Sequence, residues 1–481
     1  MSLRTPEQYR KSLLDGRRVY FGGERVSDVT KHPALGTAVD HAAIDFAMAE
    51  DPQRRDLATY TDPATGEVFS RYFKIPENSQ DLLLRSQLIE ETTRQGKTLV
   101  TLVKEIGTDC LFALHAVAHR MDQQLGTDYS SRVRAIYQHC RDNDLAMAVA
   151  QTDVKGDRSL GPSEQEHPDY YVRIVEERSD GIVVRGAKVH TSVAPNVNEL
   201  FVIPTRQMSE ADRAYAVAFA IPMDTPGLKL ICSAYGRDTQ SVDEHPIGAE
   251  HRMFETFTVF DDVFVPNERI FMKGEWQFAG PLALSFVEFH RFTAISYKLP
   301  LVDLLVGAAH LMAEYNGIER AAHVRDKLTW LIAYAETLRA LTKMAAIDAR
   351  MVDPGIAVPH TQIVNMAKLH FADNYHRALS HVQDLTGGLL VTAPGEADLR
   401  NAEIGPYLER YFGGKKGVSA RDRLKAIRMV SELTTGDFGG YQAALAIHAE
   451  GSIEAEKITV LREYAADKAK AYARWVARID G

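Results

Sequence analysis

Cysteine is scarce in this chain, which has only three among 481 residues. Cys110, Cys140 and Cys232 are isolated, and no pair stands at the spacing of metal ligands. A disulfide framework or a structural zinc site is therefore not supported. We expect the three thiols to behave as small, buried, hydrophobic side chains.

An excess of positive charge is also missing. The 56 Lys and Arg residues stand against 65 Asp and Glu, giving a net charge of -9 and a pI near 6.0. Without a basic stripe, neither a nucleic acid nor an anionic membrane is expected as the main partner. No stretch approaches the roughly 18 apolar residues that would span a bilayer, and the first residues have no apolar signal core. We expect a cytoplasmic protein.

The sequence further lacks a GxGxxG turn that follows a strand. Without it, a dinucleotide site of the Rossmann type is not expected. The absence argues against direct NAD(P)H binding. It leaves open a flavin site between a β domain and a helical bundle.

Length and hydrophobic patterning predict three regions. One core rarely organises a chain of 481 residues, and apolar residues first recur at helical spacing, then in short strands, then again at helical spacing. The strand region is punctuated by Gly, Pro and Asp, which favours a small antiparallel barrel or sandwich over a parallel α/β sheet. We predict an α+β protein with an N-terminal helical domain, a middle antiparallel β-barrel and a C-terminal helical bundle, over residues 1–146, 147–275 and 276–481.

Two polar segments of the middle region are candidates for binding a flavin. The segment from Gln151 and Thr152 to Ser159 is rich in hydrogen-bond donors, which an isoalloxazine ring needs near its N1–C2 edge. Thr191 and Ser192 follow His190 at the end of a predicted strand. The alternatives are a solvated connector for the first segment and ordinary turn chemistry for the second.

Several separate motifs resemble one enzyme family in the family's own order along nearly the whole chain. They are Thr152–Asp153 with Lys155–Ser159, the strand GIVVRGAKVH at 181–190, FDDVFVPNER at 260–269, and Thr386–Gly388. The chain is identified by them as similar to the 4-hydroxyphenylacetate 3-hydroxylase/4-hydroxybutyryl-CoA dehydratase family. The resemblance implies an acyl-CoA-dehydrogenase-like fold, in agreement with the three regions predicted from the residues.

The resemblance also implies a bound FAD and an oligomer. Carried over from the family, FAD would contact Lys155, Gly156, Asp157, Arg158 and Thr191, with Gln151, Thr152 and Ser192 beside them. Gly387–Gly388 resembles the glycine pair that lets a neighbouring subunit's backbone approach the cofactor pyrophosphate, although a helix C-cap explains the same residues. A homotetramer, or at least a homodimer, is implied.

The two branches of the family differ in their metal content. The dehydratases hold a [4Fe-4S] cluster through three Cys and one His. His290 stands at the position of that His, but Tyr297 replaces the Cys that follows seven residues later, and the segment from Glu105 to Cys110 retains one slightly displaced Cys. The resemblance therefore implies no iron–sulfur cluster.

The hydroxylase branch implies a two-component monooxygenase. Such enzymes take reduced FAD from a separate NAD(P)H-dependent flavin reductase and use O₂ to form a flavin hydroperoxide, which hydroxylates an aromatic, usually phenolic, small molecule. The missing dinucleotide motif agrees with this, because NAD(P)H is oxidised on the separate reductase. The alternative is a cluster-less acyl-CoA isomerase of the vinylacetyl-CoA type, and a third reading is a flavin-binding member that has lost its chemistry.

The candidate catalytic residues are His290, Tyr297 and Lys298. A neutral imidazole can accept a phenol proton, and Tyr297 and Lys298 lie about two turns further along a predicted helix, on a similar face. All three have structural alternatives in packing or capping. Thr205, Arg206 and Cys110 are candidate substrate contacts, since an arginine suits a carboxylate. The Arg and Tyr that bind hydroxyphenylacetate in the hydroxylases have no counterpart between Ile106 and Cys110, so another aromatic substrate is expected.

Overall fold

A computed structural model describes residues 3–235 and 241–479. The N-terminal region is largely helical, as predicted, but it also contributes two short hairpins. Its elements are α1 (Pro6–Ser12), β1 (Val19–Phe21), β2 (Glu24–Val26), α2 (Pro33–Ala42), α3 (Ile44–Ala47), α4 (Arg55–Ala58), β3 (Thr59–Thr61), β4 (Val68–Ser70), α5 (Ser79–Gln95), α6 (Glu105–Leu125) and α7 (Tyr129–Asp142).

The middle region consists of strands, again as predicted. They are β5 (Met147–Ala150), β6 (Arg173–Glu177), β7 (Gly181–Ser192), β8 (Glu199–Val202), β9 (Val217–Pro222), β10 (Leu228–Cys232), β11 (Glu255–Pro266) and β12 (Ile270–Lys273). β6 and β7 form an antiparallel hairpin, with Glu177 opposite Ile182.

The predicted closed barrel is not found among the described strands. They form a six-stranded sheet in the order β2-β1-β10-β11-β7-β6 and a separate four-stranded sheet in the order β12-β9-β8-β5. Most pairs are antiparallel, but β1 runs parallel to β10 and β5 runs parallel to β8. The alternation of apolar residues indicates strands, but it does not decide which distant strand each one pairs with.

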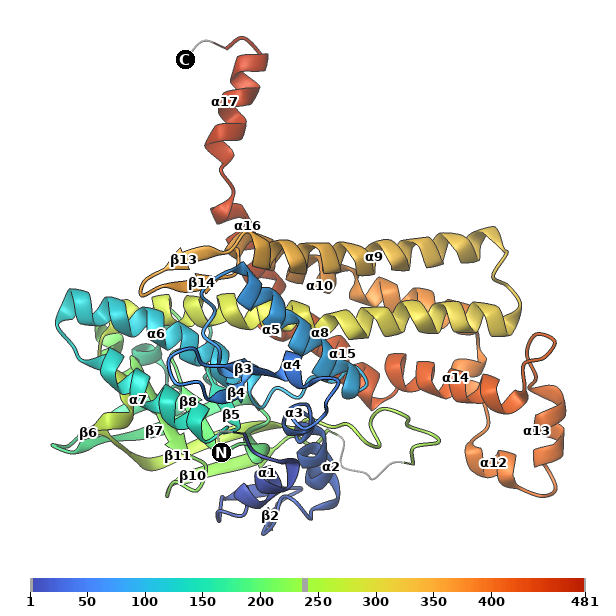
Figure 1. The fold of residues 1–481 in the computed structure, drawn as a ribbon, viewed down its shortest axis with the longest axis horizontal. Helices are drawn as coiled ribbons and strands as arrows, with labels where there is room; N and C mark the ends of the chain where they lie inside the picture. The colour runs from blue at the N-terminus through green and yellow to red at the C-terminus, as the bar shows by residue number, and fades with distance from the viewer. Residues whose placement is uncertain (1–2, 236–240, 480–481) are drawn as a thin grey trace.

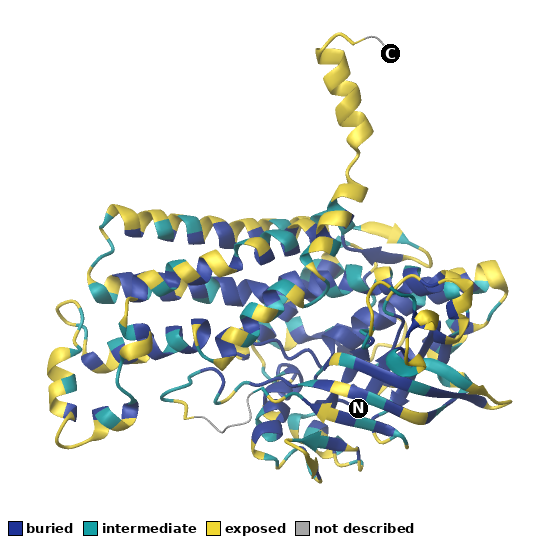
Figure 2. Ribbon diagram, turned by 180° about the vertical axis from the view of Figure 1, so that it is seen from behind, coloured by how far each residue is buried: buried dark blue, intermediate teal, exposed yellow. Residues whose placement is uncertain are grey.

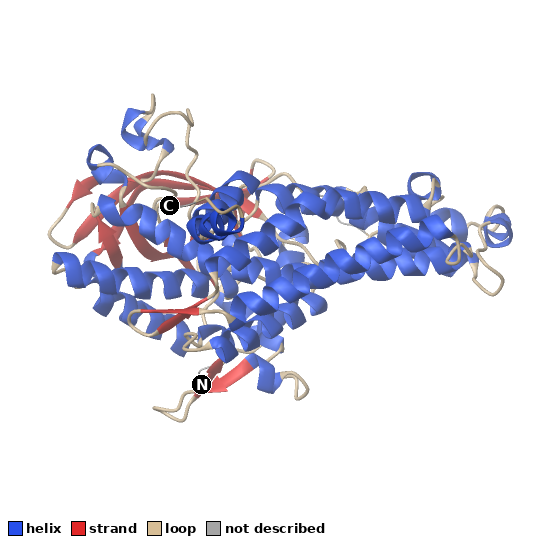
Figure 3. Ribbon diagram, turned by 90° about the horizontal axis from the view of Figure 1, so that it is seen from above, coloured by secondary structure: helices blue, strands red, loops and turns tan. Residues whose placement is uncertain are grey.

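The C-terminal region forms a bundle of long helices that extends away from the sheets (Figure 1, Figure 3). Its elements are α8 (Ala279–Asn316), α9 (Ala322–Ile347), β13 (Arg350–Val352), β14 (Ile356–Val358), α10 (Thr361–Thr386), α11 (Leu389–Thr392), α12 (Glu396–Arg400), α13 (Gly405–Tyr411), α14 (Ala420–Thr434), α15 (Asp437–His448), α16 (Ile453–Glu463) and α17 (Ala466–Val476). The order of helices, strands and helices agrees with the three predicted regions, whose boundaries as domains remain predictions.

Helix α8 is the central element of the fold. Its 38 residues extend for about 57 Å, and its neighbours are α5 and α6 on one side and α9 and α10 on the other. One continuous hydrophobic core includes residues of all three regions. Figure 2 shows the buried stripe along these helices, in contrast to the exposed α17.

The segment Trp276–Asn316 is the one described helix long and apolar enough to cross a membrane. The sequence prediction overlooked this window because its few polar residues interrupt the apolar run. In the fold, 72% of the window is buried inside the protein. A core helix passes the same test, since burial among other helices also requires an apolar surface.

Candidate active site along helix α8

His290 lies near the middle of the first half of α8, where this helix faces α6. Its side chain is 12% exposed, and Nδ1 lies 3.3 Å from Oδ2 of Asp109, which is fully buried on α6. The imidazole also stacks on Phe286 one turn earlier, with ring centroids 5.1 Å apart. The structure thus holds His290 by one carboxylate and one aromatic ring.

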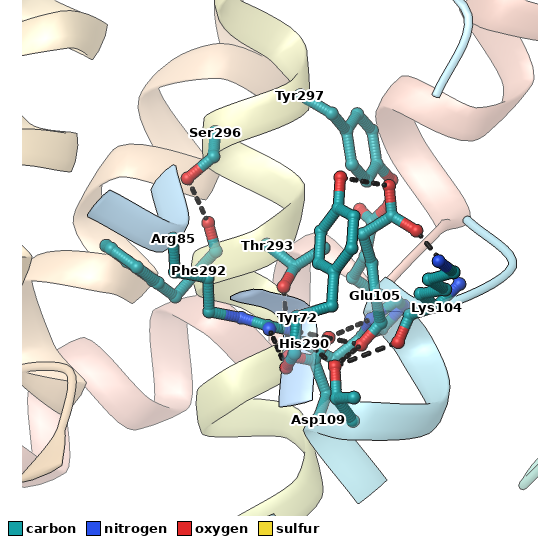
Figure 4. A network of polar contacts seen from close by, with 12 residues as sticks. Tyr72, Arg85, Lys104, Glu105, Asp109, His290, Phe292, Thr293, Ser296 and Tyr297 are labelled. Atoms are coloured by element: carbon teal, nitrogen blue, oxygen red, sulfur yellow. Dashed lines mark hydrogen bonds and ion pairs between the residues drawn. The ribbon is translucent and has the colours of Figure 1, made fainter. Parts of the chain in front are cut away.

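The other oxygen of Asp109 is occupied as well. Oδ1 accepts hydrogen bonds from Arg85 Nη2 at 2.7 Å and from Thr293 Oγ1 at 3.0 Å. Figure 4 shows Arg85, Asp109, Thr293 and His290 turned toward one another from α5, α6 and α8. Asp109 was not among the residues predicted from the sequence, because 181 positions separate it from His290.

Tyr297 and Lys298 lie together at a second charged cluster two turns further along α8. The Tyr297 hydroxyl donates to Glu450, and Lys298 Nζ donates to the second oxygen of Glu450 at 2.9 Å and lies 3.3 Å from the Tyr297 hydroxyl. Glu450 stands at the junction of α15 and α16, and its side chain is 2% exposed. Sequence reasoning missed this residue. The one signal in the sequence that could have pointed to Glu450 is its position beside Gly451, at a break between two helices.

Burial sets the protonation of this cluster. It raises the pKa of Glu450 well above its usual range, and the nearby Glu456 adds to the effect. Burial likewise lowers the pKa of Lys298 well below its usual range, and the Lys368 ammonium adds to that. Lys368 lies 3.8 Å from Glu450 and 3.3 Å from Glu456. Groups whose charged forms are all disfavoured can hold or move a proton at small cost.

The predicted flavin loop is anchored at its base by a buried ion pair. Lys188 Nζ donates to Asp153 Oδ2 at 2.8 Å and to the carbonyls of Gln151 and Ile203 at 2.7 and 3.0 Å. The Thr205 hydroxyl donates to the Gln151 carbonyl at 2.7 Å and lies against the Asp153 carboxylate. Thr205 therefore holds the loop, and the structure does not point to it as a substrate contact.

Beyond this anchor, cationic side chains gather on the loop. Burial lowers the pKa of Lys155, and the neighbouring charges of Arg158 and then Arg206 lower it further. Gly156 has φ +54°, and a Cβ there would lie 2.4 Å from Gln165 and Tyr170. The backbone at residue 156 therefore needs glycine. A phosphate or a carboxylate bound beside it could neutralise the charges of Lys155, Arg158 and Arg206.

Two further predicted residues have structural partners. Asp157 accepts from the backbone and hydroxyl of Ser159 at 2.9 and 2.7 Å, so its carboxylate closes a local turn. Thr152 is half-buried, and its carbonyl accepts from Val189 N at 2.8 Å. The backbone of Asp157 is also engaged, because its N–H donates to Gln165 Oε1 at 2.9 Å and its carbonyl accepts from Gln165 Nε2 at 2.8 Å. Gly156 beside it is exposed.

The strand end predicted to contact the flavin joins the sheet to the helical bundle. Thr191 is fully buried and accepts from the Thr258 hydroxyl at 3.0 Å. The Ser192 hydroxyl donates to Glu255 at 2.7 Å, and the Tyr441 hydroxyl of α15 donates to the other oxygen of Glu255 at 2.7 Å. Burial raises the pKa of Glu255, although these two hydrogen bonds oppose the shift. Glu255 in turn raises the pKa of Glu450, so the two clusters are neighbours.

Gly387 and Gly388 are separated from these residues within one chain. They are exposed just after α10, about 28 Å along the helix from Lys368. Gly387 is the C-cap of α10, with φ +82° and its N–H donating to the Gln383 carbonyl, so the helix end explains this glycine, as the alternative predicted. A Cβ at Gly388 would meet nothing within 4 Å. Cys110 is fully buried, and burial together with Asp109 raises its pKa well above its usual range.

The residues near His290 do not fit an iron–sulfur cluster. Such a cluster needs several thiolates. Cys110 follows Asp109 on α6, but Cys140 and Cys232 lie on α7 and β10, and Tyr297 is bound by Glu450. Within residues 3–235 and 241–479, no group of three or more His, Cys, Asp or Glu side chains could hold a metal ion. The loop 151–159 does fit FAD, since its two cations, Lys155 and Arg158, together with the nearby Arg206 and the exposed glycine backbone, suit the negative charge of a pyrophosphate or a reduced flavin.

Comparison with known proteins agrees with this architecture. The models of the 4-hydroxyphenylacetate 3-hydroxylase N terminal and C terminal domains match residues 5–272 and 279–478. The 4-hydroxybutyryl-CoA dehydratase/vinylacetyl-CoA-Delta-isomerase of Clostridium aminobutyricum is 32% identical over 99% of this chain and 100% of its own length. The 4-hydroxyphenylacetate 3-monooxygenase oxygenase component of Thermus thermophilus is 29% identical over 91% of this chain and 90% of its own.

Solved structures are similar to this chain in both branches of the family. The oxygen-tolerant 4-hydroxybutyryl-CoA dehydratase from N. maritimus has a TM-score of 0.93 and 29% identity, covering 100% of this chain and 96% of its own. The oxygenase component of 4-hydroxyphenylacetate 3-monooxygenase complexed with FAD has a TM-score of 0.90 and 27% identity, covering 98% of both chains. This chain therefore belongs to the 4-hydroxyphenylacetate 3-hydroxylase/4-hydroxybutyryl-CoA dehydratase family.

Proposed function

We propose that this protein is the oxygenase component of a two-component, FADH₂-dependent monooxygenase that hydroxylates a phenolic small molecule. The observation that carries the proposal is the chemistry beside His290. The cysteine of the dehydratases is replaced by Tyr297, whose hydroxyl is bound by Glu450, and His290 is paired with Asp109. These groups can move protons, and none of them is a thiolate, which an iron–sulfur cluster needs.

FAD fits the loop 151–159 and, when bound in its reduced form, would supply the activation of O₂. The chain's own residues supply proton chemistry and binding. His290, held through Nδ1, presents Nε2 as a base for a phenol proton, which raises the electron density of the aromatic ring. Lys155, Arg158 and Arg206 hold negative charge, of the cofactor or of an acidic substrate. Reduced FAD would come from a separate flavin reductase in the cytoplasm.

The test is hydroxylation of a phenol panel with chemically reduced FAD and ¹⁸O₂. One labelled oxygen atom in the product, detected by mass spectrometry, supports the proposal. His290→Gln is expected to lower kcat by about 100-fold or more. His119→Gln, on the exposed part of α6, is the matched control and leaves kcat unchanged. Oxygen consumption that yields only hydrogen peroxide with every phenol would contradict the proposed activity.

A second candidate, an acyl-CoA isomerase without a cluster, is favoured by one specific observation. The dehydratase/isomerase of Clostridium aminobutyricum is similar over its full length. Here Glu450 and Lys298 could shift a proton between two carbons of a bound enoyl thioester. Anaerobic incubation with vinylacetyl-CoA distinguishes the two candidates, because an isomerase moves the double bond and consumes no oxygen, whereas the monooxygenase leaves this substrate unchanged.

A further inference from the structure

The buried ion pair between Arg85 and Asp109 joins α5 to α6, and one end of it reaches His290. Asp109 is fully buried, and Arg85 is 4% exposed. Two charges this deeply buried are costly unless each hydrogen bond is satisfied. The arrangement of their partners therefore indicates what the pair does.

The Arg85 guanidinium is fixed from three sides. It donates to the carbonyls of Tyr72 and Glu105 at 3.1 and 2.9 Å and to the Thr108 hydroxyl at 2.9 Å. It also donates to Oδ1 of Asp109 at 2.7 Å and lies over the rings of Tyr72 and Phe112. With Thr293 on the same oxygen, only Oδ2 is left to face His290.

A carboxylate beside a guanidinium is ionised and accepts hydrogen bonds without donating any. The hydrogen between Asp109 Oδ2 and His290 Nδ1 must then belong to the imidazole. In the neutral form of histidine, which carries one N–H, Nε2 then keeps its lone pair. No other described residue bonds Nε2 of His290.

We propose that Asp109, locked by Arg85, is a positioning residue that fixes His290 as the Nδ1–H tautomer and leaves Nε2 as the base. This inference deepens the proposed function, on which its catalytic meaning depends. The tautomer itself depends only on the geometry of this chain, because Arg85, Asp109 and His290 all belong to it.

Asp109→Asn tests the inference without changing the shape of the side chain. The amide oxygen stays on Arg85, and the amide N–H₂ then faces Nδ1 of His290 and donates to it. The imidazole must respond by moving its hydrogen to Nε2, where the base is lost. Thr293→Val is the matched control, since it removes a hydrogen bond from the same carboxylate and leaves His290 untouched.

The tautomer is read by NMR on protein labelled with ¹⁵N-histidine, free of cofactor, with His290 assigned from the signal that His290→Gln removes. We expect a protonated Nδ1 in the wild type and in Thr293→Val, and a protonated Nε2 in Asp109→Asn. We expect Asp109→Asn to lower kcat by about 100-fold to 10,000-fold with little change in KM. A wild-type Nε2–H, or an Asp109→Asn spectrum like that of the wild type, would overturn the inference. If the tautomer changes but no variant hydroxylates a phenol, the inference stands and the proposed function fails.

Discussion

Replacing Lys188 by Met is expected to destabilise the sheet below the predicted flavin loop by about 3–5 kcal/mol. Lys188 and Asp153 are 2% and 3% exposed and lie 2.8 Å apart. Without the ammonium, the Asp153 carboxylate stays buried with only Val172 N at 3.0 Å and the Thr205 hydroxyl as partners. The loss is large because a charge without its counterion remains in a medium of low dielectric constant.

The double variant Lys188→Met/Asp153→Asn separates this explanation from a loss of packing. The Asn oxygen still accepts from Val172 N, but the unpaired charge is gone. We expect it to recover about 2 kcal/mol or more of the free energy of unfolding. Lys229→Met is the matched control. Lys229 also pairs with an aspartate at 2.7 Å, but the two side chains are 34% and 59% exposed, so the expected cost is below about 1 kcal/mol.

Urea unfolding followed by circular dichroism measures these differences at one protein concentration. The reasoning fails if Lys188→Met costs no more than Lys229→Met. It also fails if the double variant is no more stable than Lys188→Met, because an uncompensated charge would then not be the cause.

Three further predictions follow from burial and backbone geometry. Burial raises the pKa of Glu255, so the folded state retains a proton that the unfolded state releases. The stability of Glu255→Gln relative to the wild type should therefore increase as the pH rises above about 4.5. Urea unfolding at several pH values measures this difference. Burial and the neighbouring His251 lower the pKa of His41 to about 3. As the pH falls from about 6.5 to 5, the unfolded state takes up a proton at His41 that the folded state does not, so the protein should lose about 2 kcal/mol of stability. His41→Gln should remove that loss. Gly156→Ala should weaken FAD binding at least about tenfold in a fluorescence titration, because a Cβ there lies 2.4 Å from Gln165 and Tyr170. Gly126→Ala is the control. Gly126 also has a positive φ, +69°, but a Cβ there meets nothing within 4 Å, so FAD binding should be unchanged.

The candidate site was only half predictable from the sequence. His290, Tyr297 and Lys298 were selected because the motif and the helical spacing place them along one helix. Asp109 and Glu450, which hold them, lie 181 and 152 or more positions away. No local pattern distinguishes a buried aspartate or glutamate from a solvated one, so these partners could not be selected in advance.

The flavin loop shows the same division. Its polar composition indicated a binding segment, but it did not separate Asp157, which closes a local turn, from Arg158, which is exposed. The anchor of the loop likewise depends on Lys188, which reaches Gln151 and Asp153 from strand β7.

The sequence by itself determined the element types, their order and the family, since helical and strand periodicity are local and the motifs are contiguous. The tertiary structure decided the rest. It paired β1 with β10 and β5 with β8, which opened the predicted barrel into two sheets. It also brought Asp109 to His290 and Glu450 to Tyr297. The physical reason is that strand pairing and buried charge pairing are interactions between distant segments, whose free energy depends on the burial that only the complete fold provides.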